Sequence, residues 1–214
     1  MRKSQILDKP MYLFLDIHGV LTDGKERKRC LAFMENKYGM NYERHNELWN
    51  AHVGKLDTGL ERASEYVKSV NAMFRTKISV AEYFKIFTSQ IVVNKTLFKT
   101  LQKTKLYRIY IVSDNFLPIP TNLNKTFGVQ FGRWKKIYSF RYGVVKSKGL
   151  LKKAIAITGI DPKQCIFIDD SERNVRVAKK IGIDGIVFRT NRELFRDLKA
   201  RKVLVPSVRG ASFW

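Results

Sequence analysis

The sequence predicts an α/β protein in which a parallel β-sheet carries a long helical insertion. Two observations support this fold class. Short apolar segments rich in β-branched and aromatic residues alternate with amphipathic segments of helical spacing, which is the pattern of parallel βαβ units. Between the first two apolar segments, from about residue 26 to residue 101, the chain shows only helical spacing, as in NELWNAHV and VAEYFKIFTSQIV. The 214 residues, 44% of them hydrophobic, suffice for one domain or for a domain with a sizeable insertion.

The elements are predicted in a regular order. Residues 12–15 form the first strand, and RIYIVSD at residues 108–114 forms the second. Residues 149–160 predict an amphipathic helix that ends at a glycine followed by Asp-Pro. QCIFIDD at residues 164–170 is the third strand, residues 174–183 are a helix with a glycine stop, and GIVFR at residues 185–189 is the fourth strand. In a parallel sheet of this kind, ligands bind at the carboxyl ends of the strands.

The net charge is the unusual feature of the composition, because 41 Lys and Arg against 19 Asp and Glu give a formal charge of +22. Such an excess attracts polyanions, so nucleic acid, phosphorylated metabolites and anionic membrane surfaces are candidate partners. A lysine-rich proteome or a need for solubility would produce the same charge. The two cysteines, Cys30 and Cys165, lack the spacing of a zinc site or a disulfide framework. No window approaches the roughly 20 apolar residues of a membrane span, so we expect a soluble, cytoplasmic protein.

Polar residues lie at the carboxyl ends of three predicted strands. Asp16 follows the first strand, Ser113 lies near the end of the second, and Asp169 and Asp170 end the third. A parallel sheet brings these side chains to one rim, where carboxylates repel one another unless a proton or cation lies between them. A hard divalent ion with oxygen ligands, Mg²⁺ above all, is the natural occupant. Acidic residues that only cap the helices after the strands are the alternative.

Four signatures, in this order, resemble those of the haloacid dehalogenase (HAD) superfamily of phosphohydrolases and phosphotransferases. They are FLDIHGVLTDG, IYIVSD, a lysine in YGVVKSKGLLKKA, and IFIDDSERN. The resemblance covers roughly residues 10 to 190 and implies a Rossmann-like core sheet with an inserted α-helical cap. We accordingly expect a HAD-like core at residues 1–21 and 96–202, a cap at residues 22–95 and a C-terminal tail at residues 203–214. VGKLDTGLERASEYV resembles the start of the cap in the glucose-phosphatase-like and epoxide-hydrolase-like branches.

The resemblance also implies roles for the acidic residues. Asp16 would be the nucleophile that attacks phosphorus and forms an aspartyl-phosphate. Mg²⁺ would be held by the Asp16 carboxylate, the backbone carbonyl of His18 and the Asp170 side chain, with Asp169 in support. Asn174 occupies a position where many members carry a third carboxylate.

The second and third signatures carry the expected phosphate-binding groups. Ser113 and the amide after it would bind phosphoryl oxygens, and Lys146 would lie between nucleophile and phosphate. Lys148 is the alternative site lysine, because KSK departs from the usual lysine-proline pattern. Asp114 stands where Asn or Thr is more usual and would repel a phosphate unless it points away. Asn115 is then the candidate for that hydrogen-bonding role.

His18 replaces the family's second aspartate, which donates a proton to the leaving oxygen and then takes one from the attacking water. An imidazole with an ordinary pKa of about 6.5 can perform both transfers, so His18 is a candidate acid/base. Two alternatives stay open at this point. In the first, the acid/base position is dispensable, and the enzyme favours substrates with good leaving groups or turns over slowly. In the second, the active site is degenerate and the fold serves a binding role.

Two further sets of residues have alternative interpretations. Lys55 and Asp57 lie where cap loops usually reach over the active site, and they are either substrate-selecting or structural turn residues. His45 and His52 are interpreted as ordinary cap residues. In the basic segment at residues 131–153, cations alternate with aromatic side chains, which suits nucleic-acid binding or a half-buried strand. Its nucleic-acid candidates are Arg133, Trp134, Lys135 and Lys136.

The favoured hypothesis is a Mg²⁺-dependent phosphohydrolase that acts on a small phosphomonoester. The alternative is a basic protein on a HAD scaffold that associates with nucleic acid or ribonucleoprotein and has weak or no catalysis. A phosphatase for nucleotides or polynucleotide ends would combine the two. The sequence carries no transferable code for substrate identity or oligomeric state.

Overall fold

The computed structural model of the protein contains one sheet of five parallel strands. The structure describes residues 11–103, 107–128, 131 and 133–203. The strand order is β3-β2-β1-β4-β5, so the first strand in sequence lies at the centre and each neighbour is added outward from it. This is the predicted α/β fold class, with a Rossmann-like parallel sheet at its core. The strands are β1 (Met11–Leu15), β2 (Tyr107–Ser113), β3 (Lys135–Tyr138), β4 (Cys165–Asp169) and β5 (Asp184–Val187).

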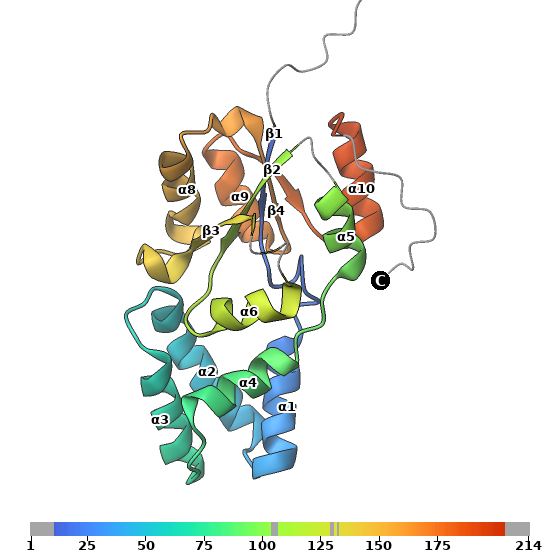
Figure 1. Cartoon of the computed structure of the whole chain (residues 1–214). Coiled ribbons are helices and arrows are strands. Elements are labelled where there is room, and N and C mark those ends of the chain that lie inside the picture. The colour runs from blue at the N-terminus through green and yellow to red at the C-terminus, as the bar shows by residue number, and fades with distance from the viewer. Residues whose placement is uncertain (1–10, 104–106, 129–130, 132, 204–214) are drawn as a thin grey trace, which may run out of the picture.

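Helices cover both faces of the sheet, which explains why its strands are continuous apolar runs. Leu13, Leu15 and Ile111 face one cluster, whereas Phe14 and Val112 face the other, as expected for side chains that alternate along a strand. Figure 1 shows α8 and α9 on one side of the sheet and α5 and α10 on the other. These helices are α5 (Lys95–Lys103), α8 (Leu150–Thr158), α9 (Glu172–Lys180) and α10 (Asn191–Ala200).

Four helices inserted between β1 and α5 pack together beyond the end of β1 (Figure 1). Asn41 and Ser79 start two of them, because their side chains accept hydrogen bonds from backbone amides of the first turn. Trp49 stacks on Phe87, and the ring of Phe116 packs beside Trp49 from the loop after β2. The insertion therefore shares one apolar cluster with the sheet. Its helices are α1 (Glu26–Tyr38), α2 (Tyr42–Asp57), α3 (Ala63–Phe74) and α4 (Val80–Ser89).

Some details differ from the elements predicted from sequence. Strand bounds agree to within about two residues, and the alternating cations and aromatics of the basic segment include the short strand β3. The helix α6 (Ile119–Phe127) had no predicted counterpart, and it begins after a cis Leu117–Pro118 bond. Short 3₁₀ turns, η1 (Ser139–Arg141), η2 (Lys146–Lys148) and η3 (Pro162–Gln164), complete the core.

The remaining sequence expectations about organisation have different outcomes. The division at residues 21/22 and 95/96 stays a prediction. Of the predicted tail, Val203 is buried, and residues 204–214 lie outside the described residues. Within the described ranges, the helices are all too short or too polar to cross a bilayer.

Candidate active site

The adjacent ends of β1 and β4 bring the predicted carboxylates together. The register pairs Leu15 with Ile168, and the Asp16 amide donates a hydrogen bond to the Ile168 carbonyl at 3.0 Å. Side-chain oxygens of Asp16, Asp169 and Asp170 consequently lie within 4.8 Å of one another. Residues separated by about 150 positions thus form one cluster, because a parallel sheet aligns the carboxyl ends of neighbouring strands.

Lys146 supplies the positive charge of this cluster from η2. Its Nζ lies 2.6 Å from Asp16 Oδ2 and 2.7 Å from Asp169 Oδ2, and its side chain is only 3% exposed. Burial alone would lower the pKa of Lys146, but the two carboxylates outweigh this effect and raise it, so the ammonium stays charged. Lys148 is exposed and lines a surface hollow with other lysines, and no ion pair joins it to these carboxylates in the described part of the chain.

The two carboxylate oxygens of Asp16 differ in their contacts. Lys146 binds Oδ2, whereas Oδ1 is buried and has no hydrogen-bond partner among the described residues. A buried polar oxygen without a partner is costly, so Oδ1 is open to contact with a bound substrate atom. The acceptor-only carboxylate oxygens around it fit a hard divalent cation.

The neighbouring carboxylates, Asp169 and Asp170, differ in burial and in hydrogen bonding. Asp169 is fully buried and accepts hydrogen bonds from the Ser171 amide and from Nδ2 of Asn174, at 2.8 and 3.1 Å. Burial raises the pKa of Asp169, and the charge of Asp16 adds to that effect. Burial, with Asp16 and Asp169 nearby, likewise raises the pKa of Asp170 to about 6. Asn174 is thus a donor to Asp169, a role that an ionised carboxylate at this position could not fill.

Gly19 allows Asp170 to approach the loop after β1. A Cβ placed on Gly19 would lie 2.2 Å from Asp170 Oδ2, and its φ of +82° disfavours any side chain. The backbone of Gly19 therefore lies directly against the Asp170 carboxylate.

The loop after β2 supplies the remaining predicted groups. Ser113 is fully buried at the strand end, and its hydroxyl lies 3.4 Å from the Asp114 carbonyl oxygen. Asp114 Oδ1 accepts a hydrogen bond from the backbone amide of Lys146 at 2.8 Å, which fixes this carboxylate against η2. Burial raises the pKa of Asp114 to about 6 despite the opposing charge of Lys146. The Asn115 amide donates to the Ser139 hydroxyl, which anchors the loop to η1.

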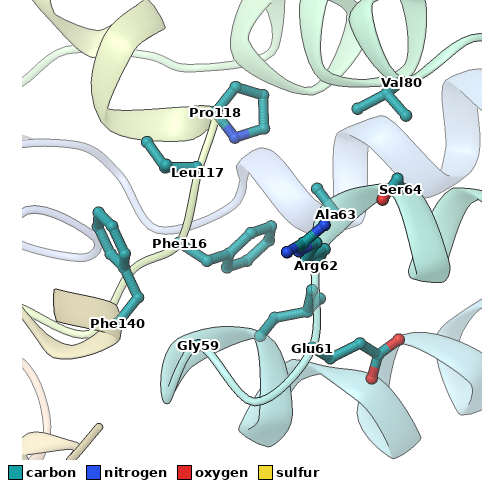
Figure 2. A pocket seen from close by; sticks show the side chains of 11 residues that line it. Gly59, Glu61, Arg62, Ala63, Ser64, Val80, Phe116, Leu117, Pro118 and Phe140 are labelled. Atoms are coloured by element: carbon teal, nitrogen blue, oxygen red, sulfur yellow. The ribbon is translucent and has the colours of Figure 1, made fainter. Parts of the chain in front are cut away.

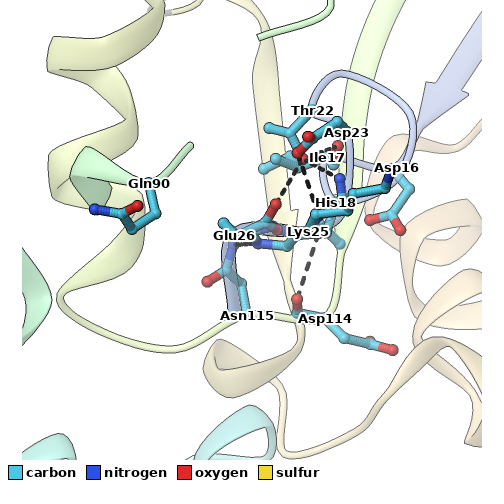
Figure 3. Close-up of polar contacts among 12 residues, drawn as sticks. Asp16, Ile17, His18, Thr22, Asp23, Lys25, Glu26, Gln90, Asp114 and Asn115 are labelled. Carbon is cyan, nitrogen blue, oxygen red and sulfur yellow. Dashed lines mark hydrogen bonds and ion pairs between the residues drawn. The ribbon is translucent and has the colours of Figure 1, made fainter. Parts of the chain in front are cut away.

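His18 lies between the insertion and this loop (Figure 3). Its Nδ1 is hydrogen-bonded to the carboxylate of Glu26, and its Nε2 lies 3.3 Å from Nδ2 of Asn115. Burial by itself lowers the pKa of His18, but Glu26 and Asp16 outweigh burial, so the pKa lies above 6.5. Glu26 is the residue that sequence reasoning missed. A glutamate in the first turn of a predicted helix is common, and nothing local marked it as a partner of His18.

The candidate residues of the helical insertion divide into those near the site and those away from it. Asp57, at the end of α2, lies within electrostatic range of Asp114, His18 and Asp16, and burial raises its pKa to about 7. Lys55 is exposed. His45 is fully buried, and its Nε2 lies between the hydroxyls of two tyrosines. His52 is partially buried, and it pairs with Glu61 through Nδ1.

An apolar cavity of about 490 Å³ opens between the insertion and the core (Figure 2). Phe116, Pro118 and Phe140 line it from the core, and Leu56 and Arg62 line it from the insertion. Leu56 directly precedes Asp57 in sequence, and Phe116 directly follows Asn115. The cavity is therefore a neighbour of the polar cluster.

The basic segment has a mixed environment. Trp134 packs against Phe98 and Phe131, and the Lys136 ammonium donates to the Phe131 and Trp134 carbonyls. Arg133 and Lys135 are exposed. Half of the nucleic-acid candidates are thus engaged in packing or internal hydrogen bonds. The segment's role in binding nucleic acid stays a prediction.

Together, these observations define an α/β protein with a parallel sheet covered on both faces and a cluster of Asp and Lys side chains at the carboxyl edge of that sheet. A family model described as haloacid dehalogenase-like hydrolase matches residues 11–182. The chain therefore belongs to the haloacid dehalogenase-like hydrolases. Its assignment to a particular cap branch stays a prediction.

Solved structures agree with this fold. A HAD family enzyme from Bacteroides thetaiotaomicron, in complex with magnesium and inorganic phosphate, is 23% identical, with a TM-score of 0.74 over 88% of this chain and 100% of that chain. A predicted HAD-like family hydrolase from Porphyromonas gingivalis is 16% identical, with a TM-score of 0.67 over 91% of this chain and 98% of that one. L-2-haloacid dehalogenase from Xanthobacter autotrophicus is 14% identical, with a TM-score of 0.62 over 92% and 85%. The curated proteins contain no match to the chain.

Proposed function

We propose that the protein is a Mg²⁺-dependent phosphohydrolase that acts on a small phosphomonoester through an aspartyl-phosphate at Asp16. The observation that carries this proposal is the state of the Asp16 carboxylate. Lys146 holds Oδ2, and Oδ1 is buried without a hydrogen-bond partner among the described residues, so one oxygen is fixed and the other is available to attack. A carboxylate in this state suits a nucleophile, because its orientation is set before the substrate arrives.

Each residue of the cluster has a role in the two half-reactions. Asp16 Oδ1 forms a bond to phosphorus as the bond to the leaving oxygen breaks, and water later hydrolyses the acyl phosphate and regenerates Asp16. The ammonium of Lys146 offsets the repulsion between Asp16 and the phosphate dianion. Ser113 and the amide that follows it would bind phosphoryl oxygens.

The carboxylates and the His18 carbonyl would hold Mg²⁺. Asp16 and Asp170 would supply side-chain ligands, with Asp169 in support, as the oxygen cluster within 4.8 Å suggests. A bound Mg²⁺ neutralises phosphate charge and polarises the phosphorus centre. The magnesium and phosphate complex of the Bacteroides thetaiotaomicron enzyme supports this part of the proposal by analogy of fold.

His18 serves as the acid/base in this proposal. Its Nε2 is the ring nitrogen that the Glu26 contact leaves for the substrate side, near Asn115. A protonated Nε2 would give its proton to the leaving oxygen, and the ring would regain a proton from the hydrolytic water. The other two hypotheses for His18, a dispensable position and a degenerate site, predict different outcomes in the experiments below.

The test is phosphate release from p-nitrophenyl phosphate, sugar phosphates, nucleotides and 3′-phosphorylated oligonucleotides, with Mg²⁺ or with EDTA. We expect Mg²⁺-dependent turnover that Asp16→Asn abolishes. Asp184→Asn is the matched control, because Asp184 lies at the opposite end of the sheet and pairs with Arg201 on the surface. Absence of turnover from folded protein on all of these substrates would refute the proposal. Metal-independent halide release from a 2-haloacid would instead favour the chemistry of the dehalogenase neighbours.

The second candidate function is binding of nucleic acid, favoured by the formal charge of +22 and by the exposure of Arg133 and Lys135. Such binding would weaken steeply with salt, because counterion release governs it. It should survive Asp16→Asn and fall when Arg133 and Lys135 are both changed to Gln. Fluorescence anisotropy with a labelled oligonucleotide at several salt concentrations measures both effects. Equal binding by the two variants would exclude the basic segment as the binding surface.

A further inference from the structure

We infer that Glu26 is a positioning residue for His18, holding its ring so that Nε2 faces the reacting phosphate ester. The inference rests on the proposed function, and it adds a residue from the helical insertion to the machinery of the core. Its basis is the geometry of a buried contact between the loop after β1 and the first turn of α1.

The Glu26 carboxylate is itself fixed. Its side chain is 4% exposed, Oε1 accepts from Nδ1 of His18, and Oε2 lies 3.4 Å from the Thr22 hydroxyl. Thr22 is buried as well, and its Oγ1 lies 3.4 Å from the Gly24 amide, so the loop and the first turn of α1 are tied together. A carboxylate with both oxygens engaged cannot rotate freely, and it therefore fixes the ring that donates to it.

The consequence for His18 is a defined orientation of its two ring nitrogens. With the Nδ1 proton directed at Glu26, the only other ring nitrogen is Nε2, which lies 3.3 Å from Asn115 Nδ2. Asn115 follows the predicted phosphate-binding Ser113 by two residues, so Nε2 lies on the side of the site that the leaving group would occupy. Without Glu26, the ring could rotate or adopt the other tautomer, and the nitrogen would lose its fixed direction.

The chain contains a second His–Glu pair outside the polar cluster, and its glutamate, Glu61, lines the apolar cavity. His52 in α2 makes the same Nδ1 contact with a glutamate, Glu61, and both side chains are largely buried. The ring of His52 packs on Tyr66 inside the insertion, 5.6 Å between centroids. Substitution of Glu61 therefore removes a similar His–Glu pair from the same protein without touching His18.

The first experiment compares two substrates that differ in their need for a proton. Phenyl phosphate has a poor leaving group, whereas p-nitrophenolate departs without protonation. We expect Glu26→Ala to lower kcat/KM for phenyl phosphate about 10²-fold, and to lower it much less for p-nitrophenyl phosphate. Glu26→Gln keeps an acceptor oxygen in place and should recover part of this loss. Glu61→Gln should leave the ratio between the substrates unchanged.

A purely structural role for Glu26 would reduce both activities equally, and that result would overturn the inference. The inference would also be overturned if the ratio of kcat/KM between the two substrates changed in His18→Ala but stayed constant in both folded Glu26 variants. If wild-type protein turns over neither substrate, the proposed function fails, and a second measurement still decides the positioning role.

That measurement is ¹⁵N NMR of the imidazoles, which is feasible because the chain has three histidines. We expect His18 to show a protonated Nδ1 in the wild type, a changed tautomer distribution in Glu26→Ala, and an unchanged signal in Glu61→Gln. The His52 signal should show the converse pattern. A neutral His18 ring protonated at Nε2 in the wild type would overturn the inference whatever the activity.

Discussion

Asp57 provides a test of how the insertion acts on the core. It ends α2, is half-buried, and its carboxylate has no hydrogen-bond or ion-pair partner among the described residues. Burial raises its pKa from 3.8 to about 7, and the negative charges of Asp114 and Asp16 add to this effect against His18 and Lys146. We predict that Asp57→Asn makes the protein more stable near neutral pH, because the variant no longer places this charge at the interface.

The sign and the size follow from linkage. Below the unfolded pKa of 3.8, Asp57 is mostly protonated in the folded and the unfolded chain, so its ionisation has little effect on stability. As the pH rises from about 4 to about 7, the unfolded chain loses this proton more readily than the folded chain, and the free energy of unfolding falls. Each unit of pKa corresponds to about 1.4 kcal/mol, so a difference of about three units sets an upper limit of about 4 kcal/mol. Partial solvent exposure screens the charge, and we expect about 2–4 kcal/mol.

The assay is urea unfolding in EDTA at about pH 4 and about pH 8, with equal m-values as the check for two-state behaviour. Asp57→Asn and wild type should be equally stable at the lower pH and differ at the higher one. Asp23→Asn is the matched control, because its bond to Arg29 lowers the pKa of Asp23, and loss of that bond should cost stability at the higher pH. A variant no more stable than wild type at about pH 8 would refute the assignment. An unfavourable carboxylate facing the site suggests a function, so we also expect Asp57→Asn to lower kcat/KM.

Two further predictions concern the carboxylate cluster. Lys146→Met removes the ammonium between two buried carboxylates, and we expect it to lower the free energy of unfolding in EDTA by about 3–5 kcal/mol, measured by urea unfolding, with partial recovery in excess Mg²⁺. Unchanged stability would contradict the buried ion pairs. Gly19→Ala places a methyl group 2.2 Å from Asp170 Oδ2, and it should weaken Mg²⁺ binding about tenfold or more in calorimetric titrations. Gly39→Ala is its control, because Gly39 also has a positive φ but, among the described residues, no atom lies within 4 Å of the added carbon. Equal Mg²⁺ affinity of the two variants would contradict the steric argument.

The sheet and its acidic rim were predictable because their signals are local. A run such as FLD or IFIDD contains both a buried strand and the acidic side chain at its end. Because parallel strands align their carboxyl ends, these side chains are predicted to meet at one edge of the sheet. The choice between Lys146 and Lys148 was not predictable in this way. The two lysines are separated by one residue in KSK, and only the 3₁₀ turn directs the first into the cluster and the second to the surface.

Contacts between the insertion and the core could not be predicted from the sequence for a related reason. Glu26 and Asp57 matter because of what they face across an interface, and neither lies in a periodic pattern that identifies its partner. In the basic segment, the same alternation is compatible with a strand and with a binding surface. Trp134 and Lys136 are engaged with the protein itself, a distinction that depends on tertiary packing.

The pairing of His18 with Glu26 makes a counterintuitive prediction about the family's usual residue. His18→Asp restores the aspartate common in the family, but it places a second carboxylate beside the buried Glu26, which then loses its partner. We expect this variant to be less stable than wild type by about 3–5 kcal/mol near neutral pH, the usual effect of breaking a buried ion pair from one side.

Adding Glu26→Gln to His18→Asp removes the repulsion and allows the amide to donate to the new carboxylate, so the double variant should recover most of the lost stability. Urea unfolding of the wild type, both single variants and the double variant gives the coupling energy directly. Additive effects of the two substitutions would show that the two side chains are energetically independent. That result would contradict the idea that Glu26 accounts for the presence of His18 at this position. Strong coupling would mean that a histidine can occupy this position because a carboxylate from the insertion accompanies it.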